Sequence, residues 1–206
     1  MSNLATLHQR LKPCFARVRP YNQAGKYIAA LMSDLPRKNG WTIAEHIGDT
    51  TPDPTQRLLN HAVWDHDTAQ GVVRGFVAEH LADQPLIVAA LDESGQQKAG
   101  DATAGVKRQY MGCAGRIANG VNAVYCSYAT TGGHALVAAR IWLPAEHLDD
   151  PERRVALGIP TDVVFRTKPQ LAQDILADMI ADQTMPPWVA GDEVYGRSGA
   201  LRTLLA

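Results

Sequence analysis

The sequence is poor in cysteine and has no long apolar run. Its three cysteines, Cys14, Cys113 and Cys126, are widely spaced and form neither a C-x-x-C pair nor a zinc-binding pattern. An odd and scattered set argues against a disulfide framework and favours a reducing compartment. No segment reaches the roughly 20 apolar residues that a membrane span needs, and the N-terminus lacks the apolar region of a signal peptide. We therefore expect a cytoplasmic protein without a membrane partner.

Familiar catalytic motifs are absent as well. The seven histidines include no H-x-x-x-H pair, so the sequence does not indicate a zinc hydrolase. Ser94 has no G-x-S-x-G motif around it, which argues against a serine hydrolase. The glycine-rich segment 112–115 lacks the Lys-Ser/Thr of a phosphate-binding P-loop. These absences direct attention to the carboxylates.

Charge is balanced over the whole chain, with a formal net charge of -1, but it is unevenly distributed. Residues 1–40 contain seven Lys or Arg and one acid, Asp34, which gives this segment +6 and leaves -7 on residues 41–206. A basic arm ahead of an acidic body is suited to phosphate contacts with nucleic acid. A basic helix face that is merely solvated is the alternative.

Residues 1–84 show the periodicity of several short helices. Apolar residues at three- and four-residue steps form the first stripe: Leu4, Leu7, Leu11, Phe15 and Val18. We expect Pro20 to end that helix. Thr42 and Glu45 have the spacing of a capping box at the start of a later helix, which Gly48 would end. Short helices with tight connections favour a helix-turn-helix-like domain, and a helical cap that packs on the rest of the chain is the alternative.

From Pro85 onward the pattern is that of strands and helices. The predicted strands cover residues 86–91, 121–129, 135–143 and 188–191, and the predicted helices cover 146–157 and 171–180. Residues 93–120 are rich in Gly, Ala, Lys and Arg and are expected to form a loop or hairpin. Strands joined by short turns, followed by a helical crossover, predict an α/β fold with an incomplete ribonuclease-H-like mixed sheet. We place the domain boundary between residues 84 and 85.

Two aspartates, Asp92 and Asp192, each follow an apolar segment that is expected to be a strand. Carboxylates at strand ends project from the edge of an α/β sheet, where such folds place their sites. Two carboxylates there can hold Mg²⁺ or Mn²⁺, which would activate the attacking oxygen and steady the leaving oxygen of a phosphodiester. Acids after strands are also common N-caps of the next helix, so a capping role stays open.

Motifs along nearly the whole chain carry a resemblance. Residues 91–95, Leu-Asp-Glu-Ser-Gly, resemble the first-aspartate motif of DDE transposases from bacterial insertion sequences, and residues 191–196, Gly-Asp-Glu-Val-Tyr-Gly, resemble the second. The middle segment of that family is similar to Leu143-Pro144, Arg153-Arg154, Gly158-Ile159-Pro160 and Phe165-Arg166-Thr167-Lys168. Its helical DNA-binding region is similar to Asn39-Gly40-Trp41, Ala44-Glu45 and Arg57-Leu58-Leu59-Asn60. Each motif is short, but their order and spacing together are specific.

The resemblance implies a ribonuclease-H-like core that cuts DNA at transposon ends and joins the 3′-hydroxyl to a target. It implies that Asp92 and Asp192 are catalytic and bind two divalent ions, Mg²⁺ or Mn²⁺. The implied partners are double-stranded DNA and a second copy of the chain, at the nucleoid of a bacterial cytoplasm. The cations expected to contact nucleic acid are Arg17, Arg19, Lys26, Arg37, Lys38, Arg57, Lys98, Lys107 and Arg108. Lys98, Lys107 and Arg108 fall in the predicted loop, for which a solvated hairpin is the alternative.

The family pattern also requires a third carboxylate, a Glu on a later helix. No acid follows Glu193, which adjoins Asp192 and is not expected to replace that ligand. We therefore expect a chain that stops before the third carboxylate and is incomplete for catalysis. A naturally shortened DNA-binding regulator or partner subunit is one alternative. A haloacid-dehalogenase-like phosphatase is another, but its site would need a second Asp at position 94, where Ser94 stands.

Overall fold

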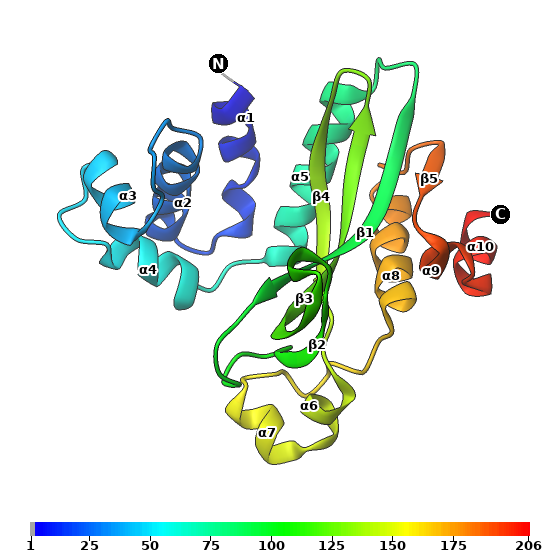
Figure 1. Cartoon of the computed structure of the whole chain (residues 1–206). Coiled ribbons are helices and arrows are strands. Elements are labelled where there is room, and N and C mark those ends of the chain that lie inside the picture. The colour runs from blue at the N-terminus through cyan, green and yellow to red at the C-terminus, as the bar shows by residue number, and fades with distance from the viewer. Residues whose placement is uncertain (1–2) are drawn as a thin grey trace. The chain divides into compact units, whose positions relative to one another are not determined.

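A computed structural model describes residues 3–206, which form two compact units that divide between Val73 and Arg74. The first unit is helical and the second contains the sheet (Figure 1). The division falls inside helix α5 (His66–Leu81), ahead of the functional boundary that we predicted after residue 84. Within residues 3–206, no helix is both long enough and apolar enough to cross a membrane.

The helices of the first unit follow the apolar periodicity of the sequence. They are α1 (Asn3–Arg10), the 3-10 helix η1 (Lys12–Cys14), α2 (Val18–Leu31), α3 (Gly40–His46), α4 (Asp53–Asn60) and the first half of α5. The single helix that we predicted up to Pro20 is wrong, because α1 and α2 are separate and Pro20 lies in the first turn of α2. Proline is tolerated there because the first turn of a helix needs no backbone N–H donor.

Helix α3 is capped at both ends. The Asn39 side chain accepts hydrogen bonds from the backbone N–H groups of Trp41 and Thr42, and the Thr42 hydroxyl accepts one from the Asn39 N–H. The capping box therefore begins at Asn39, three residues before the one that we predicted at Thr42 and Glu45. Gly48 follows the helix with a φ of 74°, a left-handed conformation that glycine adopts without strain.

The second unit is built on a mixed sheet. Its strands are β1 (Ile87–Gln97), β2 (Lys107–Met111), β3 (Arg116–Thr130), β4 (Gly133–Ile141) and β5 (Trp188–Ala190). The long strand β3 is antiparallel to β1, β2 and β4, whereas β5 is parallel to β1. Helices lie between β4 and β5 along the chain, as a crossover between parallel strands requires. The predicted α/β class with a mixed sheet is confirmed.

Residues 93–120, which we expected to form a loop or hairpin, contain the second half of β1 and a hairpin of β2 with the start of β3. Strand β1 does not end at Asp92 but continues to Gln97, and β2 is joined to β3 by the 3-10 helix η2 (Gly112–Ala114). The polar half of β1 is a strand because β3 pairs with it along its whole length. Backbone pairing, rather than apolar side chains, therefore holds this segment in the sheet.

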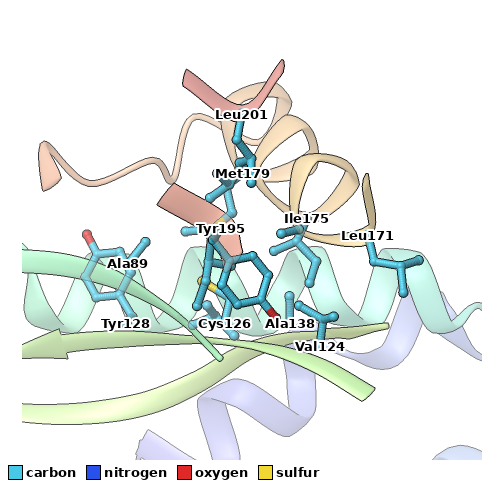
Figure 2. Close-up of a cluster of buried hydrophobic side chains, with 14 residues drawn as sticks. Ala89, Val124, Cys126, Tyr128, Ala138, Leu171, Ile175, Met179, Tyr195 and Leu201 are labelled. Atoms are coloured by element: carbon cyan, nitrogen blue, oxygen red, sulfur yellow. The ribbon is translucent and has the colours of Figure 1, made fainter. Parts of the chain in front are cut away.

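Five helices follow the sheet hairpins: α6 (Ala145–Asp149), α7 (Pro151–Ala156), α8 (Lys168–Ala181), α9 (Glu193–Gly196) and α10 (Gly199–Leu205). Helix α8 packs on the sheet and supplies Ile175, Leu176 and Met179, all fully buried against Val124 and Cys126 of β3 (Figure 2). The core covers one face of β3 and β1. Side chains alternate along a strand, so the residues of β1 that lie between the core residues point to the opposite face of the sheet.

Candidate functional site

The two predicted catalytic aspartates lie at equivalent positions of neighbouring parallel chain segments. Strands β1 and β5 pair for three residues, and the last pair is Ala90 with Ala190. Asp92 and Asp192 each follow this pair by two residues. Paired strands are about 4.8 Å apart. The two chain segments are therefore neighbours in the sheet just before they reach Asp92 and Asp192. Both aspartates are exposed.

One carboxylate oxygen of each aspartate accepts hydrogen bonds from backbone N–H groups nearby in the sequence. Asp192 is the N-cap of α9, and its Oδ1 accepts hydrogen bonds from the backbone N–H of Val194 at 2.9 Å and of Tyr195 at 3.4 Å. Oδ1 of Asp92 accepts one from the Glu93 N–H at 2.8 Å. The Oδ2 atoms of both aspartates have no hydrogen-bond partner within residues 3–206. The capping role left open for Asp192 is therefore present, and it leaves one oxygen free.

The donor chemistry of this pair fits a hard divalent cation. Mg²⁺ is commonly held by one or two carboxylates, keeps several waters and completes its shell with substrate phosphate. Asp92 and Asp192 offer two exposed carboxylates with a free oxygen each. In the described part of the chain, no group of three His, Cys, Asp or Glu side chains could hold a metal ion. Water and phosphate oxygens would complete the coordination of an ion bound by the two aspartates.

A polar cluster beside Asp92 was not predicted from the sequence. Glu93 Oε1 lies 2.5 Å from the Lys168 Nζ atom, and Glu93 Oε2 accepts a hydrogen bond of 2.9 Å from the Tyr195 hydroxyl. The three residues fall in the motifs noted above, but the partners are 75 and 102 positions apart in the sequence. No local pattern pairs residues at such separations, so only the fold reveals the cluster.

Tyr195 is the buried member of this cluster. Its side chain is 3% exposed and lies between α8 and the sheet (Figure 2). Burial raises the pKa of the Tyr195 hydroxyl, and the hydrogen bond to Glu93 and the negative charges of Glu93, Asp192 and Asp92 raise it further. The hydroxyl is therefore a permanent donor to Glu93 at neutral pH.

Three helices of the first unit form a small packed group. Helices α2, α3 and α4 pack on one another, and residues 47–52 join α3 to α4. The Gln23 side-chain amide on α2 donates to Asp49 Oδ2 at 2.8 Å and to Thr55 Oγ1 at 3.0 Å, which ties α2 to the turn and to α4. The outer side of α4 exposes Gln56, Arg57 and Asn60.

The cations of the first unit that we expected to meet nucleic acid are all exposed: Arg17, Arg19, Lys26, Arg37, Lys38 and Arg57. Two of them have partners within the unit. Lys26 Nζ lies 2.6 Å from Asp49 Oδ1, and Lys38 Nζ donates to the Leu35 carbonyl at 3.2 Å. The contacts of this set with nucleic acid stay a prediction.

The predicted basic loop of the second unit is a two-stranded ribbon of β2 and β3. Arg108 and Tyr110 alternate with inward-facing residues of β2 and are both exposed. Lys107 lies 2.6 Å from Glu146 Oε1, and Lys98 directly follows β1. The ribbon corresponds to the hairpin that was the alternative to a basic loop, and it holds its side chains at a fixed spacing.

A family model and a curated relative each match most of the chain. Residues 10–206 match the family described as DDE superfamily endonuclease. A curated relative, "Probable transposase for insertion sequence element IS701" from Microchaete diplosiphon, is 28% identical over 192 residues. The matched region covers 93% of this chain and 47% of the relative, so the chain spans about half the length of that protein. No solved structure matches the chain significantly.

Proposed function

Because the chain belongs to the DDE superfamily endonucleases, we propose that it acts in DNA cleavage and strand transfer at transposon ends. Asp92 and Asp192 hold divalent ions, Mg²⁺ or Mn²⁺, and supply two carboxylates to the catalytic site. The observation that carries this proposal is the parallel register, in which both aspartates follow the Ala90–Ala190 pair by two residues. Double-stranded DNA is the substrate, and two copies of the chain act on paired ends.

Different residues of the chain would bind the metal ions and the DNA. The bound ions would activate the attacking oxygen and neutralise charge on the leaving oxygen of the phosphodiester. Asp92 and Asp192 offer their free Oδ2 atoms to the ions, while backbone N–H groups on Oδ1 fix the orientation of both carboxylates. Arg108 is exposed on the β2–β3 ribbon, and we expect it to contact the DNA backbone.

A plasmid assay tests the proposal against its main alternative. The specific observation that favours the alternative, a DNA-binding regulator without catalysis, is the capping of α9 by Asp192. The chain is incubated with supercoiled plasmid and Mn²⁺, and open circles are measured beside DNA binding. Nicking that is lost in Asp92→Asn supports cleavage. Binding without nicking supports either the regulator or a catalytic chain that needs the third carboxylate, and the absence of both rejects the two functions together.

For the first unit we propose that α4 enters the major groove and reads bases. Gln56, Arg57 and Asn60 are exposed on one side of this helix. Arg pairs with guanine, and Gln or Asn pairs with adenine, through two hydrogen bonds each. In helix-turn-helix proteins the second helix of the motif holds this position. The exposed Arg17 and Arg19, at the start of α2, would contact phosphates.

Substitutions in the two helices are expected to have different effects on DNA binding. With a duplex selected by the chain from a random pool, Arg57→Ala should weaken binding by about 1–3 kcal/mol and relax the preference at one base pair. Arg17→Ala should weaken binding to all duplexes and lower the slope of log K against log salt by about 1. Fluorescence anisotropy over a salt series measures both quantities.

The matched control is Arg202→Ala, which removes an exposed positive charge from α10 in the second unit. It should leave both the affinity and the salt slope close to those of the unchanged chain. The assignment of α4 fails if Arg57→Ala and Arg202→Ala have the same small effect. In that case the ribbon of β2 and β3 becomes the surface to test.

A further inference from the structure

The carboxylate of Glu93 is held from two sides. It is the neighbour of Asp92 on β1, so the two side chains point to opposite faces of the sheet. One oxygen lies 2.5 Å from Lys168 Nζ, at the start of α8, and the other accepts the 2.9 Å hydrogen bond from the Tyr195 hydroxyl. With both oxygens engaged and the opposite orientation, Glu93 is poorly placed to be a third ligand beside Asp92.

Tyr195 connects the segments that carry the two aspartates, through its side-chain hydroxyl and its backbone N–H. Its hydroxyl binds Glu93, which is covalently linked to Asp92, while its backbone N–H donates to Asp192 Oδ1 at 3.4 Å. A Cβ placed on Gly191 would lie 3.1 Å from the Tyr195 Cβ, so the turn that carries Asp192 is packed tightly on this residue. The path from Asp92 to Asp192 through Glu93 and Tyr195 is therefore continuous.

The contacts of Tyr195 lie beyond the last residues at which β1 and β5 are paired. The pairing of β1 with β5 ends at Ala90 and Ala190, two residues before the aspartates. Beyond that point, the position of Asp192 relative to Asp92 depends on side-chain contacts. A hydrogen bond to an ionised carboxylate is short and strong, and burial of the Tyr195 ring limits competition from water. The Tyr195–Glu93 bond is thus a cross-link placed just past the end of the strand pairing.

We propose that Glu93 and Tyr195 are positioning residues. They hold Asp192 beside Asp92, so that both carboxylates reach the same divalent ion. Lys168 completes the arrangement by balancing the charge of Glu93 and holding that carboxylate toward α8. This inference rests on the proposed metal-binding function of the two aspartates. A purely structural role for the Tyr195 hydroxyl would affect stability alone, whereas a positioning role affects the affinity for the metal.

The test uses Tyr195→Phe, which keeps the ring in the core and removes only the hydroxyl. Mn²⁺ binding to the whole chain is measured by electron paramagnetic resonance, and folding is checked by circular dichroism and thermal melting. We expect the Mn²⁺ Kd to rise about tenfold, since outer groups that orient metal ligands typically contribute 10–100-fold to affinity. The matched control is Tyr128→Phe, because Tyr128 lies in the same core at 5% exposure and outside the cluster. Its Kd should not change.

The outcomes separate this inference from the function on which it rests. If the unchanged chain binds no Mn²⁺, the metal function itself fails. If it binds Mn²⁺ and Tyr195→Phe binds equally well, only the positioning role is overturned. If Tyr195→Phe does not fold, Glu93→Gln decides the question, because a neutral amide holds Tyr195 and Lys168 less firmly. A raised Mn²⁺ Kd in folded Glu93→Gln supports the role, and an unchanged Kd overturns it.

Discussion

Replacing Asp92 or Asp192 by Asn is expected to weaken Mn²⁺ binding at least about 100-fold, more than the loss of outer groups that only orient a ligand. Each change removes a negative charge and a carboxylate oxygen while keeping the size of the side chain. Both aspartates are exposed, so the fold should tolerate the change. Asp192→Asn should also keep the cap of α9, because the Asn side-chain oxygen can accept from Val194 and Tyr195. Titration with Mn²⁺, followed by electron paramagnetic resonance, measures the loss.

Glu193→Gln is the matched control for this experiment. Glu193 adjoins Asp192, is exposed, and lies 2.9 Å from Arg197 in an ion pair on the surface of α9. Its substitution removes the same charge one residue away, but it should leave the Mn²⁺ affinity within about twofold, because exposed charges are screened by salt. Equal losses in Glu193→Gln and Asp192→Asn would show that Mn²⁺ responds to the general negative charge and not to a defined site.

The largest expected change in stability comes from Asp182→Ala. Arg74 on α5 is only 5% exposed, and its Nε and Nη2 atoms donate to Asp182 Oδ2 at 2.7 and 2.5 Å. Removal of the carboxylate leaves a buried guanidinium without a counter-charge. Such a loss typically costs 3–5 kcal/mol, and we expect about 3 kcal/mol, because Asp182 is 35% exposed and water can partly replace it. Urea unfolding measures the free energy.

The double variant Arg74→Met and Asp182→Ala distinguishes this cause from a general loss of packing. It removes the buried charge together with its partner and keeps a long apolar side chain on α5. Replacing both members of a buried ion pair by apolar groups is often close to neutral, so the double variant should be more stable than Asp182→Ala alone. A double variant that is less stable than the single one would contradict a charge-based explanation.

The fold could be predicted from the sequence wherever apolar side chains carried the pattern. The α8 stripe and the apolar start of β1 are examples, and the family match agrees with the ribonuclease-H-like α/β fold that we predicted. The polar half of β1 escaped detection because long-range pairing with β3 makes it a strand. Gly95 marks this pairing: a Cβ there would lie 2.2 Å from the Asn122 side-chain oxygen, so the residue is packed within the sheet.

The candidate site was predictable only in its most local part. Asp92 and Asp192 stand out because each follows an apolar segment, and the parallel pairing of β1 with β5 sets them at equivalent positions. The roles of Glu93, Lys168 and Tyr195 were not visible, since these side chains meet only after α8 and α9 have packed on the sheet. The pairing of Lys26 with Asp49 likewise depends on how α2 meets the turn before α4.

The most direct test of a metal ion shared by Asp92 and Asp192 is iron-directed cleavage of the polypeptide. Fe²⁺ replaces Mg²⁺, and ascorbate with peroxide generates hydroxyl radicals that cut the backbone near the bound iron. We predict cuts close to both residue 92 and residue 192, suppressed by excess Mg²⁺ and absent in Asp92→Asn. Cuts elsewhere, or near only one of the two aspartates, would contradict a shared ion and with it the proposed catalytic site.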